Sequence, residues 1–381
     1  MEWKEDVLGS VLEVKYGKDH KKLADGQYPV YGSGGLMRYV DSKLYDGPSI
    51  LIPRKGTLNN IMFVESPFWT VDTMFWSIIN TDKVDPKFLF YSICKRDFAS
   101  MNVGSAVPSM TVNILNDILI SYPKNIEDQR RIASILSSLD RKIELNNKIN
   151  ADLEEMAQAI FKNWFVDFEP FKDGKFVDSE LGMIPEGWKV GRADEIADVV
   201  GGSTPSKAKP EYYTQKGIAW LTPKDLSNHP AVYTSRGVID ITEEGYNSTS
   251  TKLMPKGTIL FTSRAPIGYI SIAQNDICTN QGFKSLVPKK AGTCFLYCFL
   301  KYVTPEIENK STGSTFKEAS GSLMKSLQVI MPEQKVFEDF ETIVSPLFAR
   351  IESLEKENSR LSLLRDTLLP RLMSGELEVP E

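Results

Sequence analysis

The sequence predicts an α+β protein with two strand-rich heads and two long helices, arranged as an internal repeat with approximate two-fold symmetry. Three observations support this class. A heptad-like pattern of apolar side chains occurs twice, landmarks before it recur in the same order, and the preceding segments alternate short apolar runs with Gly, Pro, Asn and Ser turns. At 381 residues the chain has room for about two to three domains.

The two patterns predict a coiled coil, because an apolar seam that recurs about every 3.5 residues lets two helices pack side by side. The second pattern follows the first at an offset of 208 residues. The seam positions are Leu139, Ile143, Asn146, Asn150, Leu153, Ala157, Ile160 and Trp164 in the first, and Leu347, Ile351, Leu354, Asn358, Leu361, Arg365, Leu368 and Leu372 in the second.

The order of the segments favours antiparallel helices. Each helix follows a head, so parallel packing would crowd both heads at one end, and we expect them at opposite ends instead. The stretch from Ile132 to Trp164 gives about 50 Å of helix, which is roughly one to one and a half turns of B-DNA.

Three asparagines occupy seam positions that would otherwise be apolar, namely Asn146, Asn150 and Asn358. A polar residue at such a position costs stability and specifies register, so we expect these residues to set the register of the helices. Two alternatives stay open: the asparagines form a stripe that faces a partner, or they fall at frayed seam positions.

Five landmarks support a duplication: Trp3-Lys4 and Trp188-Lys189, residues 47–54 and 257–264, 88–91 and 295–298, 104–105 and 313–314, and Pro123 and Pro332. They divide the chain into heads at 1–125 and 188–332, long helices at 126–165 and 333–375, a turn-rich linker at 166–187, and an acidic tail at 376–381 that we expect to lack fixed structure.

The charge of the chain is unevenly distributed. The net charge is −5, but residues 1–125 carry a net of 0 and residues 188–332 carry 17 basic and 12 acidic side chains, a net of +5. The long helices, the linker and the tail together hold the remaining −10. This pattern suits nucleic-acid contact through the heads and protein contact through the helices.

The composition argues against several classes of protein. Four cysteines without a CxxC pair and two histidines make a zinc site improbable, and we expect reduced thiols in a cytoplasmic protein. The N-terminus does not resemble a signal peptide, and the apolar runs are too short to span a membrane.

Motifs for catalysis are missing from the sequence. It contains neither an Asn/Asp-Pro-Pro-aromatic methyltransferase motif nor the GxxxxGK[ST] nucleotide loop, and we interpret residues 30–34 as a tight turn. The Glu-x-Lys triplets at 308–310 and 333–335 are chance matches to a nuclease pattern. We therefore expect no catalytic centre and no cofactor.

Seven stretches together resemble the specificity subunit of a type I restriction-modification system: residues 28–35, 129–132, 160–165, 182–188, 201–206, 218–226 and 368–375. The resemblance spans nearly the whole chain. It implies that each head is a target-recognition domain for one half of a split, asymmetric site in double-stranded DNA. It also implies that the helices act as a spacer, and that the chain docks two methyltransferase subunits and, in the restricting complex, restriction and motor subunits.

We expect DNA contacts from cationic, hydroxyl and aromatic side chains in loops of the heads. Arg54 and Arg264 follow corresponding strands, where an arginine can contact guanine or a phosphate. The alternatives are surface ion pairs, solvated charges and simple turn chemistry. The candidates are Lys18, Lys21, Lys22, Arg54, Lys55, Ser105, Ser203, Thr204, Ser206, Lys207, Lys209, Tyr212, Tyr213, Lys224, Arg264, Ser314, Thr315 and Lys317.

One rival function stays open, a non-enzymatic two-headed coiled-coil scaffold that binds proteins instead of DNA. Its sequence would share the repeat and the acidic helices. The concentration of basic and aromatic residues in loops such as 203–213 favours DNA. Binding that weakens steeply with salt would distinguish the two, because phosphate contacts release counterions.

Overall fold

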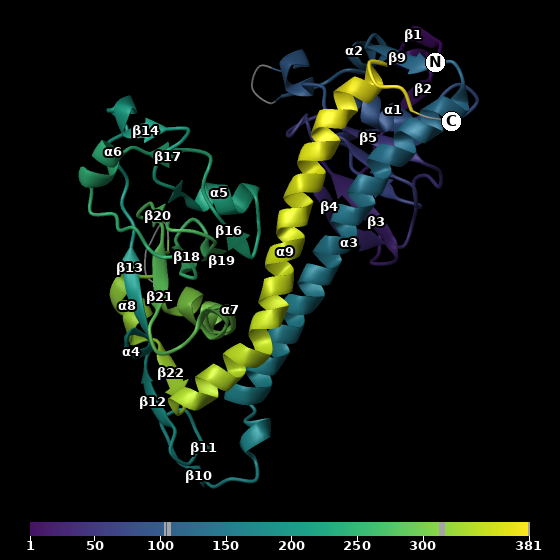
Figure 1. Cartoon of the computed structure of the whole chain (residues 1–381). Helices are drawn as coiled ribbons and strands as arrows, with labels where there is room; N and C mark the ends of the chain where they lie inside the picture. The colour runs from purple at the N-terminus through teal and green to yellow at the C-terminus, as the bar shows by residue number, and fades with distance from the viewer. Residues whose placement is uncertain (103, 105–107, 312–316, 380–381) are drawn as a thin grey trace. The chain divides into compact units, whose positions relative to one another are not determined.

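The computed structural model describes residues 1–102, 104, 108–311 and 317–379 (Figure 1). The chain divides into two compact units: unit 1 is Met1–Glu144 with Ser359–Glu381, and unit 2 is Leu145–Asn358. Each long helix contributes residues to both units. Each unit therefore contains one head together with a segment of both long helices.

The described helices fall in the order α1 (Pro86–Ile93), α2 (Val112–Asn116), α3 (Ile126–Phe165), α4 (Ala193–Ile196), α5 (Pro223–Asn228), α6 (Glu243–Asn247), α7 (Thr293–Lys310), α8 (Gly321–Ser326) and α9 (Gln334–Met373). Helices α3 and α9 have 40 residues each and contain the two heptad patterns. Both long helices that the sequence predicts are present.

Unit 1 is built on three sheets with the strand orders β1-β9, β2-β8-β5-β6 and β4-β3-β7. Its strands are β1 (Trp3–Val7), β2 (Leu12–Tyr16), β3 (Tyr28–Gly32), β4 (Gly35–Val40), β5 (Ser49–Pro53), β6 (Met62–Val64), β7 (Trp69–Thr70), β8 (Met74–Ile79) and β9 (Leu119–Pro123). Strand β5 is buried at all five positions, as expected for an apolar strand in the middle of a domain.

Unit 2 has a five-stranded sheet in the order β13-β21-β18-β19-β16 and the pairs β10-β11, β12-β22, β14-β17 and β15-β20. Its strands are β10 (Phe176–Val177), β11 (Ile184–Pro185), β12 (Lys189–Arg192), β13 (Ala197–Gly201), β14 (Tyr213–Thr214), β15 (Trp220–Leu221), β16 (Tyr233–Thr234), β17 (Asp240–Ile241), β18 (Ile259–Ser263), β19 (Ile267–Ala273), β20 (Cys278–Thr279), β21 (Lys284–Pro288) and β22 (Gln328–Met331).

The two units repeat one topology. Strands β2, β8 and β5 of unit 1 correspond to β13, β21 and β18 of unit 2, because each trio has the same order, is antiparallel and has a middle strand that comes last in sequence. The pair β1-β9 corresponds to β12-β22. The first strand of each pair begins a head, and the second strand directly precedes a long helix. The internal repeat predicted from sequence landmarks is therefore confirmed at the level of strand order.

The long helices run antiparallel within unit 2. The Asn146 side chain of α3 donates to the Asn358 Oδ1 atom of α9 at 2.8 Å. Further along α3, the Phe161 ring centroid lies 6.3 Å from that of Phe340, which comes earlier in α9, so residue numbers that rise along one helix fall along the other. In unit 1, Arg365 of α9 donates to Asp140 of α3 at 2.7 Å.

Polar side chains of the long helices bind the N-terminal ends of helices in the heads. The Asp85 N–H, which precedes α1, donates to Gln129 Oε1 of α3 at 2.7 Å. At the start of α7, the Phe295 N–H donates to Glu341 Oε1 of α9 at 2.8 Å. The first N–H groups of a helix lack partners within it and favour negative charge, so these contacts fix each head on its long helix.

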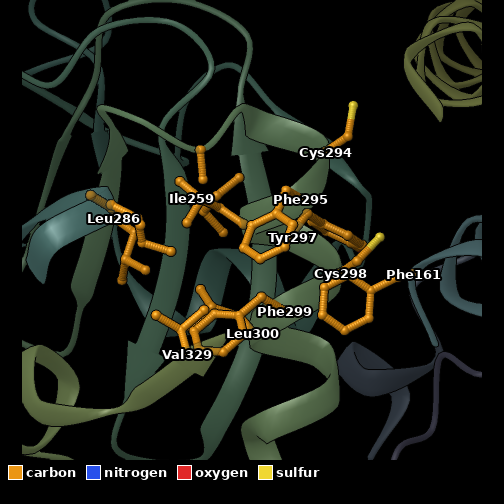
Figure 2. Close-up of a cluster of buried hydrophobic side chains, with 14 of the residues drawn as sticks. Phe161, Ile259, Leu286, Cys294, Phe295, Tyr297, Cys298, Phe299, Leu300 and Val329 are labelled. Carbon is orange, nitrogen blue, oxygen red and sulfur yellow. The ribbon is translucent and has the colours of Figure 1, made fainter. Parts of the chain in front are cut away.

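The core of unit 2 joins α7 to the sheet and to both long helices. Figure 2 shows α7 side chains, including Phe295 and Phe299, between Phe161 of α3 and Ile259 of β18. The Phe161 and Phe295 ring centroids lie 5.4 Å apart. Aromatic contacts of this kind add stabilisation to simple burial.

A partly buried carboxylate links α9 to the sheet of unit 2. Glu355 accepts the Val232 N–H at 2.7 Å and the Tyr233 N–H at 3.0 Å. Burial raises the pKa of Glu355 to about 7, against an ordinary value of 4.5, although these two hydrogen bonds oppose the shift.

The linker and the tail are both attached to cores. The ring centroid of Phe171 in the linker lies 4.7 Å from that of Trp188, the first residue of the second head. The prediction of a tail without fixed structure is wrong for its described part, residues 376–379. Leu377 and Val379 are partly buried against the unit 1 core, because their apolar side chains alternate with the acidic ones.

No helix in the described part of the chain is both long and apolar enough to cross a membrane.

Candidate nucleic-acid interface

In the first head, two strands end at the same edge of one sheet. Tyr16 at the end of β2 pairs with Phe75, and Pro53 at the end of β5 pairs with Met74, so both strands finish where β8 begins. The residues that follow β2 and β5 are brought together at this edge, which we call the head-one edge.

Arg54 is held at the head-one edge by its backbone and by its side chain. Its N–H donates to the Thr73 carbonyl at 2.8 Å. Its guanidinium lies over the Tyr16 ring at 5.4 Å from the centroid and donates to the Asp72 carbonyl at 3.1 Å. These partners orient the cation without neutralising it.

The other cations of the first head lie on loops at or after these strand ends. Lys18 is exposed two residues after β2, and its backbone is fixed by Thr70. Lys55 is exposed beside Arg54. Lys21 and Lys22 are exposed on the loop that continues from Lys18, where the Lys21 N–H donates to an aspartate of the same loop.

The second head has a corresponding edge. Gly201 at the end of β13 pairs with Lys284, and the N–H of Ser263 at the end of β18 donates to the Gly282 carbonyl at 2.7 Å. Arg264 therefore takes the place that Arg54 takes in the first head. We call this place, where β13 and β18 finish and β21 begins, the head-two edge.

Arg264 differs from Arg54 in its partner. Its guanidinium forms an ion pair with Glu318 at 3.3 Å, and Lys284 binds the other oxygen of the same carboxylate at 3.3 Å. One carboxylate thus compensates part of the charge of two cations. The ion pair that the sequence left open as an alternative for Arg264 is present.

The loop before β14 is fixed to the head-two edge by hydrogen bonds. The Ser203 N–H donates to the Thr279 carbonyl at 3.0 Å, and the Thr204 hydroxyl donates to the side chain of Gln281. Further along, the Tyr213 hydroxyl donates to the Pro205 carbonyl at 2.6 Å. Ser206 and Lys207 lie exposed between these anchors.

Lys209 and Tyr212 form a pair within that loop. The Lys209 ammonium donates to the Tyr212 hydroxyl at 2.8 Å and lies 4.8 Å from the ring centroid. The Tyr212 hydroxyl raises the pKa of Lys209. Because Tyr212 is only 7% exposed, its ring stabilises the loop, and Lys209 is the member of the pair that is open to a ligand.

Two further candidates lie exposed in the second head. Lys224 is in the first turn of α5. The neighbouring Pro223 lies close to Gly282 of the head-two edge, since a Cβ atom on Gly282 would be 2.7 Å from Pro223 Cγ. Lys317 is exposed and donates to the Glu308 carbonyl at 3.4 Å. The other candidates, Ser105, Ser314 and Thr315, lie outside the described residues.

The three seam asparagines are partly or fully buried in unit 2. Asn146 has no exposed surface and also donates to Glu357 at 2.9 Å, and Asn358 donates to Asn147 at 2.8 Å. Asn150 is 9% exposed. Buried amides that form hydrogen bonds between two helices stabilise one register of the helices and destabilise the others.

The cysteines do not have the character of nucleophiles. Burial raises the pKa of Cys94 to about 11 and that of Cys278 to about 11, and it raises the pKa of Cys294 and Cys298 further. These thiols stay protonated at neutral pH.

Sequence reasoning missed several residues at the two edges. Tyr16 supports Arg54, Gln281 anchors the 203–213 loop, and Glu318 pairs with Lys284 and Arg264. Only the tertiary fold brings these partners together, since they lie 34 to 77 residues apart in the chain.

The family model for the type I restriction modification DNA specificity domain matches residues 1–155 and 185–362. Because these matches cover most of the chain, the protein belongs to this family of DNA-specificity proteins. The family is one of DNA recognition within restriction-modification systems, and it is not a family of catalytic subunits.

Relatives agree with this assignment. The chain is 40% identical over 190 residues to the type I restriction enzyme MjaIX specificity subunit of Methanocaldococcus jannaschii. This alignment covers 49% of this chain and 44% of the relative. It is 26% identical over 386 residues to the HindI specificity subunit of Haemophilus influenzae, which covers 83% of each chain.

The fold is also found among solved structures. The S subunit of a type I restriction-modification system from M. genitalium aligns with a TM-score of 0.61 at 18% identity, over 97% of this chain and 96% of that one.

Proposed function

We propose that this chain is the specificity subunit of a type I restriction-modification complex, in which residues 1–125 and residues 188–332 each read one half of a bipartite, asymmetric DNA site. The observation that carries the proposal is the repeated edge. The chain belongs to the DNA-specificity family, and in each of its heads two corresponding strands end at one sheet edge. An arginine follows the second of these strands, Arg54 in the first head and Arg264 in the second.

In this function the edges contact DNA and the partner enzymes do the chemistry. Cations at the edges bind phosphates, and arginine, hydroxyl and amide groups read base edges. The candidate DNA contacts predicted from the sequence are kept as part of the proposal, with Lys209 taking precedence over its buried partner Tyr212.

The long helices set the gap between the half-sites and dock two methyltransferase subunits. The hydrogen bonds of Asn146 and Asn358 support a fixed register, because sliding one helix past the other breaks them. The internal repeat presents two like surfaces, which suits two like partners. Restriction and motor subunits join the complex that cleaves DNA, and the complex works in the cytoplasm.

The test is co-expression with the neighbouring methyltransferase subunit, followed by single-molecule mapping of methylated adenines. We expect a split motif with a constant gap. Replacing residues 1–125 with the first head of a relative should change one half of the motif and leave the other half and the gap unchanged.

The result that overturns the proposal is unchanged or contiguous methylation by a properly assembled complex whose methyltransferase works with another specificity subunit. In that case the two-headed protein scaffold becomes the better account. A binding affinity that does not depend on salt would point to the same conclusion, because phosphate contacts always release counterions.

A further inference from the structure

The first head carries a two-stranded ribbon with apolar side chains exposed near its tip. The ribbon consists of β3 and β4, joined by a turn at residues 33–34, and β4 is the outer strand of its sheet. On β4, Leu36 is 52% exposed, Met37 is 56% exposed and Tyr39 is 50% exposed. Consecutive large apolar residues on an uncovered strand mark a binding surface.

A bulge brings two of these side chains to the same place. The strands pair Val30 with Arg38 and Tyr31 with Leu36, so Met37 is an extra residue between the two pairs. A bulge redirects side chains and is common next to functional sites. Here it places Leu36 and Met37 together, opposite Tyr31. The base of the ribbon is anchored, since Val30 and Val40 are fully buried.

The tip of the ribbon adjoins the head-one edge. The Asn60 side chain donates to the Ser33 carbonyl at 2.8 Å. A Cβ atom on Gly56 would lie 3.0 Å from Ser33 Oγ, so the turn touches the segment that carries Arg54 and Lys55. Gly56 has a positive φ of 88° and suits this close approach. The turn of the ribbon therefore adjoins the segment that carries the two cations.

We propose that the β3–β4 ribbon enters the major groove of the DNA half-site read by the first head, with Leu36 and Met37 against thymine methyl groups. The inference rests on the proposed function and names residues that determine specificity within it. The major groove, about 12 Å wide, admits a two-stranded ribbon. Arg54 and Lys55 then lie where a groove-bound ribbon meets phosphates, so the neighbouring charge fits DNA as the occupant.

The chemistry of the contact is specific to one base. Thymine alone among the four bases places a methyl group in the major groove, and an apolar side chain recognises it by excluding water. Removal of one such methyl group is expected to weaken binding by about fourfold, from roughly 0.8 kcal/mol per buried carbon.

The experiment combines DNA and protein changes in one cycle. The probe is a duplex with the mapped recognition motif, bound by the assembled complex with methyltransferase subunits, and the readout is fluorescence anisotropy. Each thymine of the half-site read by the first head is replaced in turn by deoxyuridine, which lacks the methyl group. The protein variants are Leu36→Ala, Met37→Ala and the double variant.

We expect at least one deoxyuridine position to weaken binding by the wild-type complex, and expect the Leu36→Ala or Met37→Ala complex to lose that sensitivity. Leu253→Ala, which alters a 46% exposed leucine in unit 2, is the matched control and should keep it. Deoxyuridine in the half-site read by the second head should change the affinity by the same factor in the wild-type complex and in every ribbon variant.

Four outcomes overturn the inference: a half-site without thymine, no deoxyuridine effect at any position, an effect that all ribbon variants retain, or ribbon variants that lose methyltransferase subunits on gel filtration. The last outcome assigns the ribbon to a protein partner. Each of these can occur while the bipartite motif remains intact, so failure of the inference is distinguishable from failure of the proposed function.

Discussion

The two edges differ in how their arginines are held, and this difference predicts unequal effects of substitution. To bind DNA, Arg54 has to give up only a hydrogen bond to a neutral carbonyl, because a guanidinium can stay over the Tyr16 ring while its N–H groups bind a base. A bidentate contact with guanine is worth about 1–3 kcal/mol. We therefore expect Arg54→Ala to weaken specific binding by about 5- to 100-fold.

Arg264 starts from a charged partner. A partly exposed ion pair such as Arg264–Glu318 is worth about 0–1 kcal/mol, so the net gain on binding DNA, and the loss on Arg264→Ala, is smaller by up to about fivefold. Glu318→Gln should act in the opposite direction. It releases Arg264 and Lys284 together and should strengthen binding and make its salt dependence steeper.

The assay is anisotropy of a labelled duplex with the assembled complex at several salt concentrations, with thermal unfolding as the control for folding. If Arg54 contacts a phosphate and not a base, Arg54→Ala lowers the slope of log affinity against log salt by about 0.9 and affects all sequences equally. Wild-type affinity of a folded Arg54→Ala complex at every salt concentration would refute the reasoning.

Three further predictions concern the helices and unit 2. Asn146→Leu should lower the free energy of unfolding by about 1–3 kcal/mol because it leaves the Oδ1 atom of Asn358 without its donor, and changing Asn358 to leucine as well should recover most of the loss; equal stability of the single and the double variant in urea would contradict this. Arg365→Met should destabilise the chain less in an Asp140→Asn background than in the wild type, and strictly additive losses in a double-mutant cycle would show that the pair does not interact. Because burial raises the pKa of Glu355 from 4.5 to about 7, its contribution to stability is fully present below pH 4.5 and is lost as the pH rises through 7, by up to about 3 kcal/mol; Glu355→Gln should remove this part of the pH profile, and identical profiles would disprove it.

Much of the architecture could be predicted from the sequence because it depends on local periodicity. The seam from Leu139 to Trp164 identifies a helix by its spacing alone, and its recurrence 208 residues later identifies the second. A run such as residues 49–53 must be buried, whatever surrounds it. The fold class and the internal repeat follow from patterns of this kind.

The sites were less predictable because their contacts are not local. Chain order identified Arg54 and Arg264 as equivalent, but it could not show that one stacks on Tyr16 and the other binds Glu318. Tyr212 was predicted to contact DNA because it is an aromatic residue in a polar, basic loop, but its side chain is buried.

The sequence by itself determined the two long helices, the buried strands near residues 49–53 and 259–263, and the internal repeat. The reason is that the period of apolar residues is a property of the chain. Only the tertiary structure decided which charges are neutralised, which aromatic rings face solvent, and that the ribbon bearing Leu36 and Met37 adjoins Arg54 and Lys55. Those properties depend on pairs of residues brought together by the register of the strands, and nothing in the local sequence specifies the partner.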